Sequence, residues 1–245
     1  MREIILLLVF TVNLLSYSCS KDDIITPDKA SLKVKYWYHS INDTIPIRKY
    51  EYQYDNSKRL ERINHYSKNS DVMITYELFK YNIDNAVENK YTYSYCCDSL
   101  GWLIGDSTNY SYENGKLILE ETYYPPPNDY QVSIHYEYDG SKVTKETWYD
   151  YGGFAYCIEY LYDNEVCVKE TRYSDLEMEY MSGYTKHFYD GNLRIRTERY
   201  TSQDHNFQVI TYSYDVNGNL ITEESIKTDF TVVAPIEYFY RYEYY

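Results

Sequence analysis

The sequence predicts an all-β fold, in which antiparallel β-hairpin repeats form a large curved sheet or a barrel-like or spiral shell. Three observations lead to this prediction: a recurring Tyr-x-Tyr-Asp phrase, turn-forming residues directly after it, and alternation of residue types before it. Tyrosine dominates the composition, with 36 of 245 residues, so the repeat rather than any single site decides the architecture.

Each repeat unit is marked by the tyrosine that ends its first strand. These tyrosines are Tyr54, Tyr81, Tyr112, Tyr138, Tyr162, Tyr189, Tyr214 and Tyr240. In four units a second tyrosine follows eleven residues later, for example Tyr149 after Tyr138. A constant spacing around a turn is what a hairpin of constant register produces. About eight units predict roughly sixteen strands, and because strand twist accumulates, such a sheet closes into a barrel, winds into a spiral or stays open and curved.

The turn residues and the alternation locate the strands. The turns fall at Asn114-Gly115, Asp139-Gly140, Asp163-Asn164, Asp190-Gly191 and Asn217-Gly218. Asn and Gly tolerate the positive φ that tight hairpin turns require. Before Asp139, one strand face carries Ile134, Tyr136 and Tyr138, and the other carries Ser133, His135 and Glu137. The return strands alternate less cleanly, and we expect their charged stretches, such as Lys145-Glu146-Thr147, to lie nearer the solvent. No helix is expected after residue 19.

The N-terminal residues predict export and lipidation. The apolar run over residues 4–15 is too short to span a bilayer but matches the core of a signal peptide. Small residues then precede Cys19, in a pattern that resembles the lipobox of bacterial lipoproteins. This resemblance implies that residues 1–18 are a lipoprotein signal peptide and that Cys19 is acylated, so that its partner is outer-membrane lipid. The alternative is an ordinary secreted protein with a free Cys19.

The segment after Cys19 predicts where the protein resides. Residues 19–30 read as a lipidated N-terminus and flexible tether, and residues 31–245 as the tyrosine-rich β-hairpin repeat domain. Ser20-Lys21-Asp22-Asp23 resembles the lysine-plus-acidic export tag of bacteroidete surface lipoproteins. That resemblance implies a lipid-anchored protein on the exterior of the outer membrane, and the alternative is a solvated acidic linker.

The repeat itself resembles known repeats. The Tyr-x-Tyr-Asp … Gly-x-Leu phrase is similar to the YD repeats of rearrangement-hotspot proteins and to repeat-bearing bacteroidete lipoproteins whose domain of unknown function has a porin-like fold. The resemblance covers roughly residues 36–245. It implies a shell of hairpins, which in larger relatives surrounds a cargo segment, but it names no ligand.

Charge and patterning exclude some functions. The net charge of −14 argues against a nucleic-acid partner, because phosphate binding needs a basic face. A lipid-facing barrel wall needs a band of apolar side chains. One face here carries His135 and Glu137 and the other carries tyrosines, so we do not expect the strands to insert into a bilayer.

Aromatic residues are the candidate ligand contacts, because their rings stack on sugars and on other aromatic groups. The candidates are Trp37, Trp102 and Trp148, which interrupt the repeat, and Tyr138, Tyr162, Tyr189 and Tyr214, which belong to it. The alternative is that the tyrosines are the core of the repeat. The Asp-Ser/Thr pattern at Thr44, Ser99 and Ser107 resembles a bacteroidete O-glycosylation signal and implies exposed loops.

The remaining reactive residues follow no catalytic or metal-binding pattern. We expect no metal, no cofactor and no enzymatic activity, because the histidines and carboxylates match no known motif spacing. Cys96, Cys97, Cys157 and Cys167 are expected to be free thiols. In a hairpin that turns at Asn164-Glu165, Cys157 would face Arg172 and Cys167 would face Tyr162, so that the two thiols point apart.

Together these features predict a surface lipoprotein with a β-repeat module that binds a glycan or a peptide. The alternative is a structural, partner-docking or immunity-type repeat protein without a small-molecule ligand.

Overall fold

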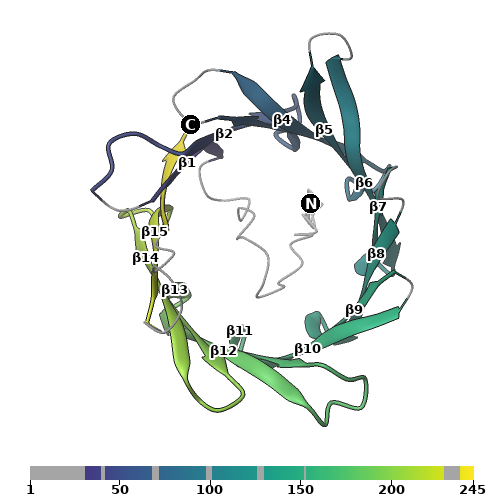
Figure 1. Ribbon diagram of the computed structural model, residues 1–245, viewed down its shortest axis with the longest axis vertical. Helices are drawn as coiled ribbons and strands as arrows, with labels where there is room; N and C mark the ends of the chain where they lie inside the picture. Colours follow the sequence, from purple (N-terminus) through teal and green to yellow (C-terminus); the bar gives the residue numbers. More distant parts are fainter. Residues whose placement is uncertain are drawn as a thin grey trace, which may run out of the picture.

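The computed structural model describes residues 31–39, 42–67, 72–97, 101–125, 130–151, 153–228 and 238–245. These residues form sixteen antiparallel strands in one closed barrel, in which consecutive strands pair and β1 pairs with β16 (Figure 1). The predicted shell of hairpins is therefore confirmed, and of the three forms left open by the sequence the closed barrel is found. The described residues contain no helix that is long and apolar enough to cross a membrane.

The strands are β1 (Leu32–Tyr38), β2 (Arg48–Tyr54), β3 (Leu60–Tyr66), β4 (Met73–Tyr81), β5 (Val87–Cys97), β6 (Gly101–Glu113), β7 (Lys116–Tyr124), β8 (Tyr130–Asp139), β9 (Lys142–Asp150), β10 (Gly153–Asp163), β11 (Val166–Tyr173), β12 (Met181–Asp190), β13 (Leu193–Thr201), β14 (Asn206–Tyr214), β15 (Leu220–Lys227) and β16 (Tyr238–Tyr244).

The two ends of the barrel differ in their connections. At one end, which we call the turn end, short turns join β2 to β3 and every following hairpin pair up to β14 and β15. Positive φ angles at Asn114, Gly140 and Asn164 confirm the predicted turns. At the opposite end, the loop end, several connections are longer, such as residues 174–180. Leu32 pairs with Tyr244, so the start of β1 and the end of β16 both lie at the turn end.

Every complete hairpin carries a β-bulge at the same place. Tyr138 pairs with Val143, but Glu137 pairs with Lys145, so Thr144 is the extra residue on the return strand. Equivalent register shifts occur directly before Tyr54, Tyr81, Tyr112, Tyr162, Tyr189 and Tyr214. A bulge reverses the alternation of the strand beyond it. This reversal is why the return strands look irregular in the sequence.

Burial identifies the inner face of the barrel, because side chains on the concave side of a closed sheet converge and those on the outer side diverge. On β8, Ile134 and Tyr136 are buried, whereas His135 and Glu137 are exposed. The predicted alternation is thus confirmed, with the tyrosine face inside. A cluster of buried inner side chains lies on β7 to β11 and consists of Leu117, Ile134, Tyr136, Val143, Tyr160 and Cys167.

One tyrosine per unit ties its hairpin to the preceding one at the turn end. Its hydroxyl donates a hydrogen bond to a backbone carbonyl oxygen of the neighbouring strand. The bonds run from Tyr54 to Leu32, Tyr81 to Leu60, Tyr112 to Val87, Tyr138 to Leu117, Tyr189 to Cys167, Tyr214 to Arg194 and Tyr244 to Leu220, at 2.7–2.9 Å. Tyr162 occupies the same place in β10. We call these eight tyrosines the tyrosine belt.

The belt closes on itself. Each acceptor residue is the strand partner of the previous belt tyrosine, as Leu60 is of Tyr54. Leu32, which accepts the bond of Tyr54, is the partner of Tyr244. The expectation that Tyr240 is the eighth repeat tyrosine is therefore wrong. The last strand pairs with β1 instead of a following return strand, so the residue that reaches the turn end is Tyr244.

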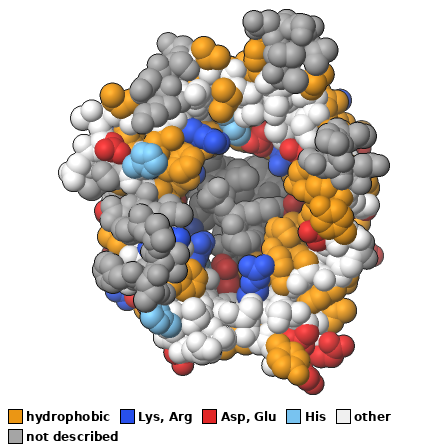
Figure 2. Space-filling model, in the orientation of Figure 1, with side chains coloured by type: hydrophobic (Ala, Val, Ile, Leu, Met, Phe, Trp, Pro, Cys, Tyr) orange, Lys and Arg blue, Asp and Glu red, His pale blue; other side chains and the backbone are white. Residues whose placement is uncertain are grey.

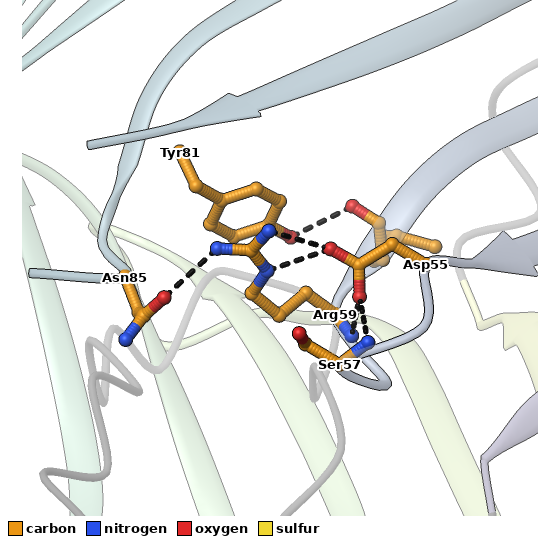
Figure 3. Close-up of polar contacts among 6 residues, drawn as sticks. Asp55, Ser57, Arg59, Tyr81 and Asn85 are labelled. Carbon is orange, nitrogen blue, oxygen red and sulfur yellow. Dashed lines mark hydrogen bonds and ion pairs between the residues drawn. The ribbon is translucent and has the colours of Figure 1, made fainter. Parts of the chain in front are cut away.

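Cations cover the rings of three belt tyrosines. Arg59 lies 4.6 Å from the centroid of the Tyr81 ring and forms an ion pair with Asp55 at 2.7 Å, while Tyr81 donates to the carbonyl of Leu60 (Figure 3). Asp55 also accepts the backbone N–H groups of Ser57 and Arg59, which holds the turn. Lys116 over Tyr138 and Lys142 over Tyr162 repeat the cation–ring contact at 5.3 and 5.5 Å.

A single hydroxyl deletion tests the belt. Tyr112→Phe removes the hydrogen bond to Val87 and leaves a carbonyl oxygen without its donor. We expect the free energy of unfolding in urea to fall by about 1 kcal/mol. Tyr151→Phe is the matched control, because Tyr151 is 76% exposed and lies outside the belt. Tyr151→Phe should lower the free energy of unfolding by less than about 0.5 kcal/mol. Equal decreases for Tyr112→Phe and Tyr151→Phe would contradict a stabilising belt.

Alkaline pH tests the same bonds collectively. Burial raises the pKa of Tyr81, Tyr112, Tyr138 and Tyr162 to about 12 from an ordinary value of 10.0. A folded-state pKa above the unfolded one means that the stabilisation is complete below about pH 10 and is lost as the pH rises towards 12. The urea midpoint should therefore fall steeply over this interval. A midpoint that stays constant while tyrosinate absorbance appears would contradict the assignment.

Candidate functional site

The inner wall of β8 to β11 gathers the aromatic and charged side chains best suited to hold a ligand. At its centre lies Glu146 of β9, which is 1% exposed. Its strand neighbours are Tyr136 on β8 and Ile158 on β10. The bulge at Thr144 places Glu146 on the same inner face as Val143, three residues earlier. The expectation that this stretch lies near solvent is therefore wrong for Glu146 and for its neighbour Thr147, which is also buried.

The two carboxylate oxygens of Glu146 differ. Oε2 accepts a hydrogen bond from the indole Nε1 of Trp148 at 3.1 Å. Oε1 is buried and has no hydrogen-bond partner among the described residues. A buried ionised oxygen without a donor is costly, because it has lost its hydration without replacement. Glu146 therefore has unused capacity to accept a hydrogen bond or an ion pair.

Three side chains form a layered stack beside this carboxylate. The rings of Trp148 and Tyr156 lie nearly parallel, with centroids 5.1 Å apart and planes 19° apart. The guanidinium of Arg172, on β11, lies 3.5 Å from the centroid of the Tyr156 ring. Strand pairing produces the stack, because Tyr156 pairs with Trp148 and Arg172 pairs with Ile158.

The charge of Glu146 acts on four phenol groups. Burial raises the pKa of Tyr136, Tyr138, Tyr156 and Tyr162, and the negative charge of Glu146 raises each of them further. These side chains therefore stay protonated at neutral pH. The site presents one carboxylate within a wall of neutral aromatic rings, with the guanidinium of Arg172 stacked on one of them, Tyr156.

Equivalent carboxylates in other units are differently satisfied. Glu120 accepts the hydroxyl of Tyr136 at 2.7 Å, and Glu170 lies 3.0 Å from Nε2 of His187. Glu223 accepts the hydroxyl of Tyr242 at 3.1 Å. In each case the partner stands two residues before the belt tyrosine of the next strand. Glu146 instead turns to Trp148 on its own strand.

The structure brings together only some of the candidate ligand contacts. Trp148 donates a hydrogen bond to Glu146, and the charge of Glu146 acts on the phenols of the belt tyrosines Tyr138 and Tyr162. Tyr189 and Tyr214 are belt tyrosines of later units, and their hydroxyls bind backbone carbonyls. Two other candidates lie elsewhere. Trp37 lies on the inner face of β1, with its ring centroid 6.3 Å from that of Tyr240, and Trp102 packs with Tyr76 on the outer face.

Glu146, Tyr156 and Arg172 were not among the sequence candidates. A signal for Glu146 exists in the sequence, because four return strands place a glutamate three residues after the partner of the belt tyrosine. These glutamates are Glu120, Glu146, Glu170 and Glu223. In a regular strand without a bulge, residues three apart, such as Val143 and Glu146, would lie on opposite faces, so the sequence alone does not place the glutamate inside.

The cysteines only partly follow the prediction. Cys157 is a buried free thiol, and it pairs with Tyr173 rather than Arg172 because the bulge shifts the register. Cys167 faces Tyr162 on the inner side, as expected. Cys167 is disulfide-bonded, so the prediction of a free thiol is wrong there; its partner is not among the described side chains. The side chains of Cys96 and Cys97 lie outside the described parts.

The modification sites have mixed outcomes. Thr44 is exposed between β1 and β2, whereas Ser107 is half-buried within β6, so the expectation of an exposed loop is wrong for Ser107. Ser99 and Cys19 lie outside the described residues. Among the residues that the structure describes, no group of three His, Cys, Asp or Glu side chains is arranged to hold a metal ion.

Comparison with known proteins identifies the fold. No protein-family model and no curated protein matches the chain. A crystal structure of a porin-like protein from Bacteroides uniformis aligns with a TM-score of 0.57 and 11% identity, covering 87% of this chain and 96% of that chain. The chain thus has a porin-like barrel fold, as predicted. The lipoprotein class and the relation to YD repeats stay predictions.

Two further solved structures align more weakly. TcdB2-TccC3 without its hypervariable C-terminal region gives a TM-score of 0.24 at 10% identity, over 78% of this chain and 14% of that chain. A protein of unknown function from Bacteroides fragilis gives a TM-score of 0.23 at 15% identity, over 54% of this chain and 87% of that chain. Both TM-scores are too low to indicate a shared fold.

A pair of tryptophan substitutions tests the arrangement at Glu146. Trp148→Phe removes the one donor that Glu146 has among the described residues. Trp37→Phe removes an indole N–H that has no partner in the described structure, and it serves as the matched control. We expect Trp148→Phe to lower the free energy of unfolding by about 1–3 kcal/mol more than Trp37→Phe. Equal losses in urea unfolding would contradict the hydrogen bond.

Proposed function

We propose that this chain is a surface lipoprotein whose acylated Cys19 anchors it to the outer membrane, while its porin-like barrel stands in water and binds a glycan or a peptide on its inner face. The observation that carries the proposal is the charged outer wall of the barrel. Two ion pairs lie on this wall. Nζ of Lys145 is 3.6 Å from Oε1 of Glu137, and Nζ of Lys49 is 2.8 Å from Oε1 of Glu51.

Charges at these positions oppose insertion of the barrel into lipid. Arg196 and Glu198 form a further outer pair on β13 at 3.2 Å, and Lys, Arg, Asp and Glu side chains are visible around the barrel rim in Figure 2. A lysine or arginine facing the bilayer midplane costs about 2–4 kcal/mol in barrels that do insert. Charges distributed around the wall favour a barrel in water, which then needs a separate anchor.

The position of the chain ends gives the anchored barrel an orientation. Because β1 begins at the turn end, a tether over residues 19–30 would attach there. The turn end would then face the membrane, and the loop end, with its longer connections, would face the exterior. The likeness to a porin-like protein supports the association with an outer membrane.

Binding on the inner face is supported by the unused oxygen of Glu146 and by the stacked rings of Trp148 and Tyr156. These are groups that recognise ligands, since aromatic faces stack and a carboxylate accepts hydrogen bonds.

A structural or partner-docking role is the second candidate, and an outer-face cluster favours it. Tyr76 stacks on Tyr93 at 4.7 Å and contacts Trp102 at 4.9 Å, and Arg62 lies 3.9 Å from the centroid of the Tyr76 ring. Tyrosine, tryptophan and arginine are the residues most enriched at protein interfaces. A partner that co-purifies with the detergent-solubilised protein, and is lost on Trp102→Ala, would favour this role.

Replacement of Cys19 tests the anchor and the location of the barrel together. Cys19→Ser should move the protein from the membrane to the soluble fraction, because the fatty-acyl anchor is lost. The purified variant should stay monomeric without detergent and should produce no conductance in a planar bilayer. A variant that remains in the membrane or conducts ions would contradict the proposal.

The same soluble variant tests binding. On arrays of glycans and of peptides, at least one ligand should bind above background, and Trp148→Ala should weaken that binding by about tenfold or more. Failure on both arrays would refute the binding module and leave the docking role.

A further inference from the structure

The four equivalent glutamates of the return strands show one departure from a common hydrogen-bonding pattern. Glu120, Glu170 and Glu223 each have a partner on the following strand, whereas Oε1 of Glu146 has none among the described residues. Glu146 is also the most buried of the four, at 1% exposed. In the other three units the glutamate has a partner on the following strand, whereas Glu146, which lies beside Trp148 and Tyr156, keeps one carboxylate oxygen without a partner among the described residues.

We propose that Glu146 anchors a binding site for a primary ammonium group, and that the ligand presents this group on a lysine side chain. The inference rests on the proposed binding function and names the chemistry of its ligand. Oε1 of Glu146 would accept the ammonium, and the surrounding rings would contact its carbon stem.

The charge of the site selects a cation. In the described part of the chain no lysine, arginine or histidine forms an ion pair with Glu146, and Arg172 is stacked on Tyr156 instead. A neutral hydroxyl, such as the one Glu120 receives from Tyr136, would satisfy the hydrogen bond without supplying an opposite charge. An ammonium supplies both the donor and the opposite charge.

The aromatic side chains near Glu146 also favour a cationic ligand. Tyr136, Tyr138, Tyr156 and Tyr162 lie close enough for Glu146 to perturb their ionisation, and Trp148 bonds to it directly. Ring faces attract cations, most strongly when water is excluded. A carboxylate within neutral aromatic rings is therefore a site for an alkylammonium and a poor one for an anion.

Access favours lysine over an amino sugar. Only 1% of Glu146 is exposed, so the incoming group must be slender. The four-carbon stem of lysine can carry an ammonium between aromatic rings, and its methylene groups pack on them. An amino sugar carries its ammonium directly on a ring, which is broader than a single alkyl chain.

The test uses the soluble Cys19→Ser protein and calorimetric titration with three probes. These are a capped pentapeptide with a central lysine, the same peptide with acetyl-lysine, and a glucosamine tetramer. The lysine peptide should bind, and acetylation should weaken binding by about tenfold or more, because it removes the charge.

Two glutamine variants complete the test. Glu146→Gln should weaken binding of the lysine peptide by about tenfold or more, whereas Glu120→Gln, at the equivalent position one unit earlier, should change it by less than about twofold. Thermal melting checks folding, and Glu146→Gln should melt no lower than the parent, because it removes an uncompensated buried charge. If this variant did not fold, the comparison of lysine with acetyl-lysine would decide alone.

Each other outcome overturns the inference. No binding of the lysine peptide, equal binding of the acetylated peptide, or unchanged binding by a folded Glu146→Gln variant would refute the ammonium site. Glu146-dependent binding of the glucosamine tetramer alone would refute the lysine assignment. An array ligand that binds parent and Glu146→Gln equally would refute the inference while preserving the binding module, so the two failures are distinguishable.

Discussion

The hydrogen bond from a tyrosine hydroxyl to the backbone carbonyl of the neighbouring hairpin is the interaction on which the rest of the barrel depends. It joins adjacent units at the turn end through side chains, where the strand ladder is interrupted by a bulge in every complete hairpin. Because the bond of Tyr54 ends on Leu32, the partner of Tyr244, the series closes across the junction of first and last strands. The repeated hairpins thus form a closed barrel, which has no unpaired edge strand to which another chain could add.

The same bulge that accompanies each belt tyrosine determines what faces the interior. By reversing the alternation of the return strand, it turns Glu146 inward together with Val143. Carboxylates that would otherwise face water are buried among tyrosines, and most of them receive a donor from the next strand, as Glu120 does from Tyr136. The candidate site is therefore a variation within the repeat, at the one unit where the carboxylate turns to Trp148 instead.

Hairpins, turns and the alternation of the two strand faces could be predicted from local patterns, because turn chemistry and period-two alternation act over a few residues. Three features could not. Closure depends on the accumulated twist and stagger of all strands, which no single segment encodes. The bulges have no distinctive residue, since Thr144, Val168 and Ile195 all occupy the extra position, so the partner predicted for Cys157 differs from the observed one by one residue. The sequence pattern predicts Glu146 near solvent for the same reason, and the strand partners of Glu146 on β8 and β10 come from two separate repeats.

Closure of the barrel is tested most directly by hydrogen–deuterium exchange of backbone amides in β1 (Leu32–Tyr38) and β16 (Tyr238–Tyr244). In a closed ring these two strands are hydrogen-bonded on both sides, so their amides should exchange as slowly as those of the central strands β8 and β9. Fast exchange confined to β1 and β16 would mean that they are free edges of an open sheet, and would contradict the account.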